Sequence, residues 1–272
     1  MRSYGKEKKL RFPYVFMACC FFLAIIGFTF FNLFSQRIFS EIPIRRSVNQ
    51  ETRDGSVSNI PFQVLSWKPR IFYLPNFATK QQCEALINMA KPKLKPSLLA
   101  QKIGETAESI QNVRTSTGVF ISADEDESGL IASIEEKIAI ATRVPRDHYE
   151  SFNILRYKLR QKYDSHHDVL DPAEYGAQKS QRLASFLLYL SSVEEGGETM
   201  FPFEDERNMD GSYDYMKCTG MRVKPRRGDA IFFYNLLPNG TIDERSLHGS
   251  CPVIKGEKWV ATKWIRDQPY ED

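Results

Sequence analysis

The stretch QKYDSHHDVL, residues 161–170, contains two of the four histidines of this 272-residue chain, followed directly by an aspartate. Imidazole nitrogens and carboxylate oxygens are common metal ligands, so this stretch can supply part of a metal site. In an extended segment alternate side chains share a face. We therefore expect His166 and Asp168 to point to one side together and His167 to point away.

A third ligand has to come from elsewhere in the chain, and His248 is the candidate. It lies in SLHGSCPVIKGEKW, at an expected turn between two strands, whereas we interpret His148 in PRDHYE as a surface or turn residue. Two histidines and one carboxylate form the facial arrangement of non-haem Fe(II) oxygenases, which leaves coordination positions open. Zinc is the alternative ion, but catalytic zinc sites with these ligands usually include a helical H-E-x-x-H pair, and the sequence has none.

Lys258 stands ten residues after this third candidate ligand, in the strand-like segment EKWVATKWI. Alternation directs Lys258, Val260 and Thr262 to one face of the strand, and Trp259 and Ala261 to the other. A lysine that points into a pocket between strands needs an anion, because burial of an unpaired charge is costly. Taken alone, a solvated strand lysine is the simpler interpretation.

The elements that have to position these residues are mostly short strands. From residue 149 onward, strand-like segments are separated by Gly, Pro and Asp, which is typical of an antiparallel sandwich or barrel. The expected strands are ESFNILRYKL, QRLASFLLYLS, ETMFPF, GMRVKP, AIFFYNL, CPVIK and KWVATKWIR. The strand-like RIFYLP and two helices precede them: one follows the N-cap Thr79 and ends at Pro92, and one covers 126–142. We therefore expect a mainly β fold with flanking helices packed outside.

The N-terminal part has a different composition. Residues 1–12 carry five basic residues, and the uncharged run PYVFMACCFFLAIIGFTFFNLF is long enough to cross a bilayer. A cleavable signal peptide has a shorter apolar region with a small-x-small end, and the alternative of a buried core helix is disfavoured because no acidic or polar face interrupts the run. We therefore predict a cytoplasmic tail (1–12), a single transmembrane signal anchor (13–35), a lumenal stem (36–66) and a folded catalytic domain (67–272).

Charge and cysteine content agree with a lumenal domain. The net charge is only +3, with 37 Lys and Arg against 34 Asp and Glu, so nucleic acid is not the expected partner. We expect a single-pass type II protein of the endoplasmic reticulum or Golgi membrane. An oxidising lumen permits disulfides, and the sequon at Asn239 is compatible with a glycosylated lumenal surface.

The order of these motifs resembles the 2-oxoglutarate- and Fe(II)-dependent dioxygenases, and within them the plant-type membrane-anchored prolyl 4-hydroxylases. The resemblance covers about residues 67–267 and includes RTSTGVF, NILRYKLRQKYDSHHD, QRLASFLLYLSSVEEGGETMFP, GMRVKPRRGDAIFF and SLHGSCPVIKGEKWVATKW. It implies a double-stranded β-helix, or jelly roll. In that fold the Fe(II) ligands would be His166, Asp168 and His248, and the C5 carboxylate of 2-oxoglutarate would bind Lys258, beside Tyr157 and Thr199.

The implied activity is that of a procollagen-proline-type 4-dioxygenase. Peptidyl proline in proline-rich secreted or cell-wall glycoproteins, of extensin and arabinogalactan type, would be hydroxylated to 4-hydroxyproline. O2 would be consumed, 2-oxoglutarate would be decarboxylated to succinate and CO2, and L-ascorbate is a further implied cofactor. Two alternatives stay open: a non-catalytic membrane-tethered module that binds proline-rich peptides within a hydroxylase complex, and a hydroxylase of lysine or a small molecule. Association with other prolyl hydroxylases is also left open.

The resemblance further implies a peptide groove. Its lining would consist of Tyr163, Arg182, Glu150 and Trp264, with a mobile loop above it that carries Arg114 and Ser116. Polyproline II peptides dock on aromatic-lined grooves, which suits the tyrosine and the tryptophan, although such residues in strands are often core.

The chain departs from the family pattern at three positions near the expected site. Arg266 stands where a histidine is common, Arg160 replaces a glycine, and Ser165 replaces a proline. We expect the first two to affect the choice of peptide. Cys218 and Cys251 flank strands near the metal side and are expected to form a disulfide, which leaves Cys83 as a free buried thiol.

Overall fold

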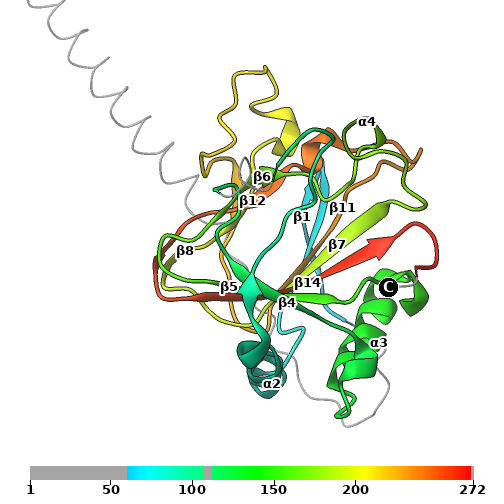
Figure 1. Cartoon of the computed structure of the whole chain (residues 1–272), viewed down its shortest axis with the longest axis vertical. Helices are drawn as coiled ribbons and strands as arrows, with labels where there is room; N and C mark the ends of the chain where they lie inside the picture. Colours follow the sequence, from blue (N-terminus) through cyan, green and yellow to red (C-terminus); the bar gives the residue numbers. More distant parts are fainter. Residues whose placement is uncertain (1–59, 107–111, 271–272) are drawn as a thin grey trace, which may run out of the picture. The chain divides into compact units, whose positions relative to one another are not determined.

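A computed structural model describes residues 60–106 and 112–270 of the chain (Figure 1). This part is mainly β, as predicted, with short helices around the sheets. The predicted tail, the signal anchor and the stem up to residue 59 lie outside the described residues. Within the described ranges, no helix has the length and apolar character needed to cross a membrane.

The larger sheet of the described chain has the strand order β1-β2-β11-β7-β14-β5-β4-β3, and every neighbouring pair is antiparallel. Its strands are β1 (Gln63–Trp67), β2 (Arg70–Leu74), β3 (Lys95–Pro96), β4 (Thr117–Ile121), β5 (Phe152–Tyr157), β7 (Arg182–Tyr189), β11 (Ala230–Tyr234) and β14 (Lys258–Arg266). The long buried strands β7 and β14 lie at its centre, so both faces of the sheet are covered there.

A smaller sheet packs in the order β10-β9-β12-β6, and β13 pairs with β8. These strands are β6 (Tyr163–His166), β8 (Glu195–Gly196), β9 (Thr199–Phe201), β10 (Met221–Val223), β12 (His248–Ser250) and β13 (Val253–Lys255). Two sheets of antiparallel strands, with crossings between distant parts of the sequence, are consistent with the expected jelly roll.

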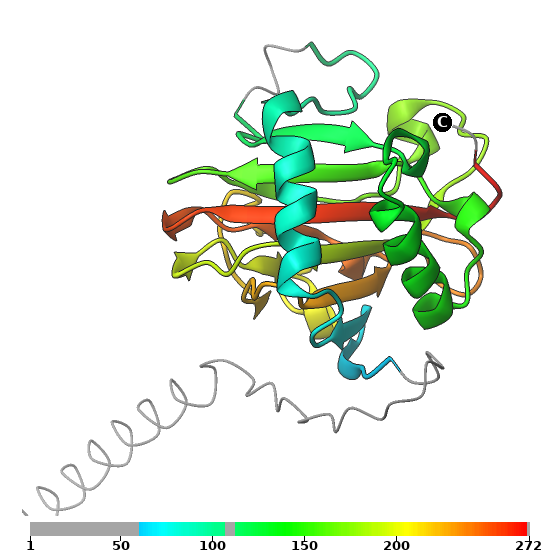
Figure 2. The ribbon, with the colours of Figure 1, turned by 90° about the horizontal axis from the view of Figure 1, so that it is seen from below.

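Helices cover one face of the larger sheet, where α2 and α3 lie (Figure 2). The α-helices are α2 (Lys80–Ala90), α3 (Leu130–Thr142) and α4 (Pro172–Tyr175), and the 3-10 helices are η1 (Lys91–Lys93), η2 (Ala123–Glu125), η3 (Arg146–His148), η4 (Glu204–Glu206) and η5 (Glu244–Ser246). The predicted cap of α2 is confirmed: Thr79 and Gln82 form a capping box. The second helix begins at Leu130 rather than at residue 126.

The late start of α3 has a local cause. Gly129 has a φ of +71°, which is outside the right-handed helical region. The Asp126 carboxylate instead accepts hydrogen bonds from the backbone N–H of Ile131, at 2.7 Å, and of Ser128, at 3.0 Å. The predicted first turn is therefore a capping turn.

Alternation along β14 separates the core from a cavity. Trp259, Ala261 and Ile265 belong to the hydrophobic core under the helices. Lys258 and Val260 face the other way and line a cavity between the two sheets. The predicted division of this strand into two faces is confirmed.

All seven strands expected after residue 149 are present. Two further strands, β6 and β12, carry the candidate ligands His166 and His248 and were not predicted. His248 lies in β12, which pairs with β6, and not in a turn. In addition, β1 begins at Gln63 and pairs with β2, so the predicted boundary between stem and domain falls inside a strand. Its mixed polarity reflects its place at the edge of the sheet, where one face meets solvent.

Candidate active site

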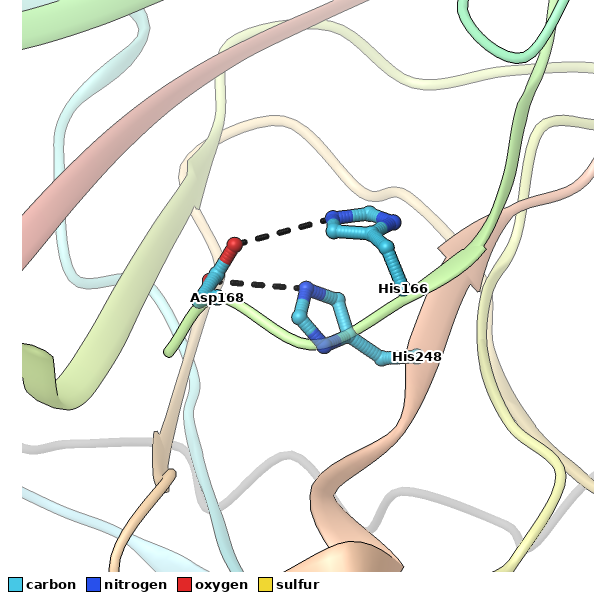
Figure 3. Close-up of side chains that lie close together, drawn as sticks. All are labelled: His166, Asp168 and His248. Carbon is cyan, nitrogen blue, oxygen red and sulfur yellow. Dashed lines mark ion pairs between the residues drawn. The ribbon is translucent and has the colours of Figure 1, made fainter. Parts of the chain in front are cut away.

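The candidate metal ligands come together at one end of the smaller sheet (Figure 3). His166 ends β6, His248 begins β12, and these two residues are register partners. Nε2 of His166 lies 3.6 Å from Oδ1 of Asp168, and Nε2 of His248 lies 3.5 Å from Oδ2. The three candidate ligand atoms all lie within 4.8 Å of one another.

Both imidazole rings are oriented by backbone carbonyl groups. Nδ1 of His166 lies 2.8 Å from the carbonyl oxygen of Asp164, and Nδ1 of His248 lies 3.0 Å from that of Ser246. Because a carbonyl oxygen can only accept, Nδ1 carries the proton in both rings. The lone pair of each ring is therefore on Nε2, the atom that faces the aspartate, which is the arrangement of metal-binding histidines.

Buried polar side chains hold the carboxylate. Ser185 of β7 donates from Oγ to Oδ2 of Asp168 at 2.5 Å, and Asn235 donates from Nδ2 to the same serine at 2.9 Å. Burial raises the pKa of Asp168, but the electrostatic effect of His248, of His166 and of the Arg182 guanidinium outweighs it and holds the pKa well below its ordinary value. The carboxylate is thus ionised and fixed in orientation.

Burial also sets the charge of the second histidine. His248 is 4% exposed, and burial lowers its pKa to about 4, although Asp168 acts in the opposite direction. The imidazole is therefore neutral at neutral pH, as a metal ligand has to be.

Gly249 allows β12 to approach β6 closely. A Cβ atom at this position would lie 3.0 Å from the backbone oxygen of Tyr163 and 2.8 Å from Cε of Met200. Glycine therefore fits where a side chain would push the two ligand-bearing strands apart.

The neighbouring histidine points elsewhere, as predicted. Nε2 of His167 lies 3.0 Å from the backbone oxygen of Glu244, on η5. Adjacent residues His166 and His167 thus face opposite sides of the backbone, and only the first joins the cluster.

The cavity between the sheets connects this cluster to Lys258. Its empty volume is about 420 Å³, and the predicted cosubstrate residues Tyr157 and Thr199 line it together with His166, Asp168, His248 and Lys258. The lysine is 1% exposed, and its Nζ donates to Oγ of Ser250 at 2.7 Å. Burial lowers the pKa of Lys258 to about 7, against the favourable charge of Glu198.

A larger groove with about 1990 Å³ of empty volume adjoins the cluster, and His166 and Asp168 are among its lining residues. Of the predicted peptide-binding residues, it is lined by Arg114, Tyr163, Arg182 and Trp264. The ring of Tyr163 stacks on His166 with centroids 3.6 Å apart, and the Arg182 guanidinium lies 3.6 Å from the ring centroid of Trp264. The groove therefore opens beside two of the candidate metal ligands.

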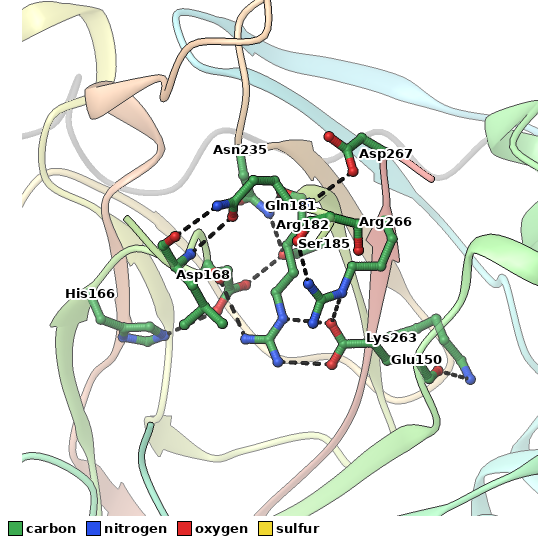
Figure 4. A network of polar contacts seen from close by, with 12 residues as sticks. Glu150, His166, Asp168, Gln181, Arg182, Ser185, Asn235, Lys263, Arg266 and Asp267 are labelled. Carbon is green, nitrogen blue, oxygen red and sulfur yellow. Dashed lines mark hydrogen bonds and ion pairs between the residues drawn. The ribbon is translucent and has the colours of Figure 1, made fainter. Parts of the chain in front are cut away.

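Glu150 does not line this groove and lies between two guanidinium groups (Figure 4). Its carboxylate accepts two hydrogen bonds from Arg182, at 2.7 and 2.8 Å, and forms an ion pair with Nε of Arg266 at 2.7 Å. Glu150 is 5% exposed, so its contact with a peptide would be through Arg182.

Arg114 of the predicted mobile loop lines the groove. Arg114 and Ser116 are buried, and Nε of Arg114 donates to Oγ of Ser116 at 3.2 Å. The Arg114 guanidinium also lies 4.7 Å from the centroid of the Tyr163 ring, and the two residues form a β-bridge. These contacts attach the segment before β4 to β6.

The cysteines are arranged as expected. Cys218 and Cys251 form a disulfide, and Cys83 is free and buried. Asn239 is exposed, and its Oδ1 accepts hydrogen bonds from the backbone N–H and the hydroxyl of Thr241.

Several residues that complete the site were not predicted from the sequence. Ser185 and Asn235 support the aspartate, Ser250 binds the lysine, and Tyr189 donates to Oγ1 of Thr199 at 2.8 Å. Of these residues, only Ser250 had a signal in the sequence. It lies two residues beyond His248, so in an extended strand both side chains point to the same face.

Comparison with known proteins agrees with this geometry. Residues 152–266 match the family model of the 2OG-Fe(II) oxygenase superfamily. Over 277 residues the chain is 74% identical to prolyl 4-hydroxylase 13 of Arabidopsis thaliana, with 100% of both chains covered. The chain belongs to the prolyl 4-hydroxylase family. It is also 55% identical to probable prolyl 4-hydroxylase 9 of the same plant, covering 100% of this chain and 99% of the relative.

A solved structure of a prolyl hydroxylase is similar as well. The viral collagen prolyl hydroxylase from Paramecium Bursaria Chlorella virus-1, in its 2OG complex, is 27% identical, with a TM-score of 0.50 over 72% of this chain and 95% of that chain. The prolyl 4-hydroxylase described here is therefore an Fe(II)- and 2-oxoglutarate-dependent dioxygenase. Its membership in a family of enzymes argues against the alternative of a non-catalytic binding module.

The residues of the site fit the groups that this family uses, Fe(II) and 2-oxoglutarate. Two imidazole Nε2 atoms and one ionised carboxylate form a facial ligand set that suits Fe(II). At the far end of the same cavity, a buried lysine bonded to a neutral hydroxyl suits the carboxylate of 2-oxoglutarate.

Proposed function

We propose that this enzyme hydroxylates C4 of peptidyl proline in proline-rich secreted or cell-wall glycoproteins of extensin and arabinogalactan type. The reaction would be coupled to the decarboxylation of 2-oxoglutarate to succinate and CO2. The observation that carries this proposal is one continuous cavity, with His166, Asp168 and His248 at one end and Lys258 at the other, beside a groove lined by aromatic side chains.

The cavity orients the cosubstrate. Lys258 would pair with the C5 carboxylate, and the Ser250 hydroxyl already holds its Nζ in position. The C1 carboxylate and the keto oxygen would then point to the candidate iron ligands. Bound Fe(II) supplies the activation of O2, and the ligand set leaves open positions for it. The walls of the cavity also include the apolar side chains of Leu155, Leu187 and Val260.

The groove suits a proline-rich peptide. A polyproline II helix has no internal hydrogen bonds and docks through its rings on aromatic surfaces. Tyr163 and Trp264 provide such surfaces beside the ligand cluster, and the exposed ring of Phe120 lies 6.2 Å from that of Trp264. Tyr163 stacks on a candidate iron ligand, so a proline bound against Tyr163 would lie close to the reacting centre.

The proposed location is the lumen of the endoplasmic reticulum or Golgi, with the chain anchored by residues 13–35 in type II orientation. The Cys218–Cys251 disulfide and the exposed sequon at Asn239 support an oxidising secretory compartment. Protease protection of the domain in sealed microsomes, and a shift of mass on treatment with a glycosidase, test this location.

The activity is tested with the purified full-length chain. It is supplied with Fe(II), 2-oxoglutarate, L-ascorbate, O2 and a proline-rich peptide of extensin type. Formation of succinate together with the gain of one oxygen atom on proline is expected. Succinate no higher than that from the His166→Ala variant would rule the proposal out. Peptides in which lysine is the candidate target residue, and pull-down with other prolyl hydroxylases, test the remaining alternatives.

A further inference from the structure

The loop between β9 and β10, residues 202–220, carries two tyrosines beside β6 (yellow in Figure 1). Tyr213 is partly buried, whereas Tyr215 is 52% exposed. Tyr215 also lines the large groove, together with Ser165, His166 and His167. An exposed aromatic ring at the wall of a peptide groove is a candidate contact for the peptide.

Hydrogen bonds to β6 fix the position of the loop around Tyr215. The backbone oxygen of Tyr215 accepts a hydrogen bond from the N–H of Ser165 at 3.1 Å, next to the candidate ligand His166. The hydroxyl of Tyr213 lies 2.9 Å from Oγ of the same serine. The loop is thus attached to β6 through both backbone and side chain.

Tyr213 supports its neighbour. Its ring packs on Phe203, with centroids 5.3 Å apart, and contacts the ring of Tyr215 edge-on at 5.2 Å. The Cys218–Cys251 disulfide then ties the end of the loop to the residue after β12. Tyr213 therefore packs inside the loop, whereas the ring of Tyr215 remains half exposed to solvent.

The groove has room for more than the target residue, with an empty volume of about 1990 Å³. Tyr163 and Trp264 lie next to the ligand cluster and the Arg182–Glu150 pair, so they suit the proline that reacts. Tyr215 lines the same groove from a different element, the loop between β9 and β10. A polyproline II segment advances about 3.1 Å per residue, so several of its residues would lie along the groove at once.

We propose that Tyr215 is a peptide-binding residue that stacks on a proline ring flanking the reacting proline. This inference rests on the proposed function, because it assigns a further contact to the same peptide. A rigid aromatic platform loses little conformational entropy on binding and favours substrates with consecutive or closely spaced prolines. The enzyme would therefore prefer extended proline-rich segments to an isolated proline.

The test compares two peptides and three variants of the full-length chain. One peptide is a short sequence with a single proline, and the other contains a long proline-rich repeat. Tyr215→Ala removes the ring, Tyr215→Phe keeps it, and Trp67→Ala removes an exposed ring that does not line the groove. Steady-state kinetics give KM and kcat, and calorimetry without O2 gives the affinity for the peptide independently of turnover.

Tyr215→Ala should raise KM and Kd for the long peptide by roughly 2- to 10-fold, as expected for one aromatic contact. The kcat, the KM for the short peptide and the affinity for 2-oxoglutarate should not change, and Tyr215→Phe and Trp67→Ala should behave as wild type. Unchanged binding of the long peptide by Tyr215→Ala would overturn the inference. A wild-type chain that binds the peptide without forming hydroxyproline would refute the proposed function instead, and calorimetry would still decide the role of Tyr215.

Discussion

Lys258 and Ser250 are joined by a hydrogen bond of 2.7 Å between Nζ and Oγ. Ser250 ends the short strand β12, and His248 begins it. One strand of three residues therefore contacts both ends of the cavity, the candidate iron ligands and the candidate carboxylate site. β12 therefore couples the position of His248 to that of Lys258, the two groups between which 2-oxoglutarate would bind.

The first prediction concerns the proton on Lys258. Its pKa is lowered to about 7 by burial, so a fraction of the lysine is neutral at pH 7 and most of it is neutral at pH 9. A bound carboxylate favours the charged form. Binding of 2-oxoglutarate above pH 7 should therefore take up as much as one proton, and its affinity should fall as the pH rises. Calorimetry in buffers of different ionisation enthalpy measures this uptake.

Lys258 should also make the free energy of unfolding of the chain depend on pH when no cosubstrate is bound. Between the folded pKa of about 7 and the ordinary value of 10.5, the unfolded chain binds more protons than the folded chain. The free energy of unfolding should therefore rise with pH across this window. Lys258→Met should flatten this rise in urea titrations and weaken 2-oxoglutarate binding by roughly 2 to 5 kcal/mol. A rise of equal slope in the variant would contradict the prediction.

The second prediction separates the two adjacent histidines. His166→Ala should abolish binding of Fe(II) and turnover, because its Nε2 faces Asp168. His167→Ala should retain most of both, because that ring contacts the backbone of η5 instead. Metal content after equilibrium dialysis and the yield of succinate check this. The reverse result would show that the extended segment has the opposite register.

Gly249→Ala is expected to impair the site although no ligand changes. The new methyl group would approach the backbone oxygen of Tyr163 and force β12 away from β6, at a cost of about 1 to 3 kcal/mol. The affinity for Fe(II) should fall together with the free energy of unfolding. Gly240→Ala is the control, because nothing lies within 4 Å of a Cβ at that position, so its cost is confined to the backbone strain of its φ of +83°. It should leave the affinity for the metal unchanged.

The sequence predicts best what depends on a repeating pattern within one element. Alternation along KWVATKWIR was enough to place Lys258 on the cavity side of β14. The cap at Thr79 was equally local. By contrast, β6 and β12 are too short and too polar to show a period, and they form because distant residues such as His166 and His248 pair.

The supporting residues depend on the same long-range pairing. Ser185 lies in the apolar run of β7 and looks like a core position until Asn235 and Asp168 are brought beside it. The sequence around Tyr215 does not predict that it lines the groove, because its position depends on the hydrogen bond from the backbone N–H of Ser165. Contacts between elements that are far apart in the sequence have no local signature, so single-sequence reasoning missed them.

Arg266 gives a prediction about pH. Its guanidinium pairs with Glu150 and donates to the backbone oxygen of Ser180 at 2.8 Å. Arg266→His would replace a permanent charge by a group with an ordinary pKa of about 6.5. Between about pH 6 and 8 the imidazole loses its charge and no longer helps to fix the Glu150 carboxylate. Glu150 then positions Arg182 less firmly, so the KM of this variant for the peptide should rise across this pH range. Arg266→Lys should keep the wild-type profile, and an identical profile for Arg266→His would exclude this role.

The last prediction concerns the disulfide and Tyr215 together. Cys218 and Cys251 are 33 residues apart, so replacing both by serine should lower the free energy of unfolding by about 3 to 4 kcal/mol. The loop that presents Tyr215 would then be held only by its contacts with Ser165. The KM for the long proline-rich peptide should rise in this variant, and adding Tyr215→Ala should raise it little further, because both changes disturb one contact. Steady-state kinetics of the single and combined variants measure this coupling, and fully additive effects would mean that the disulfide does not position the tyrosine.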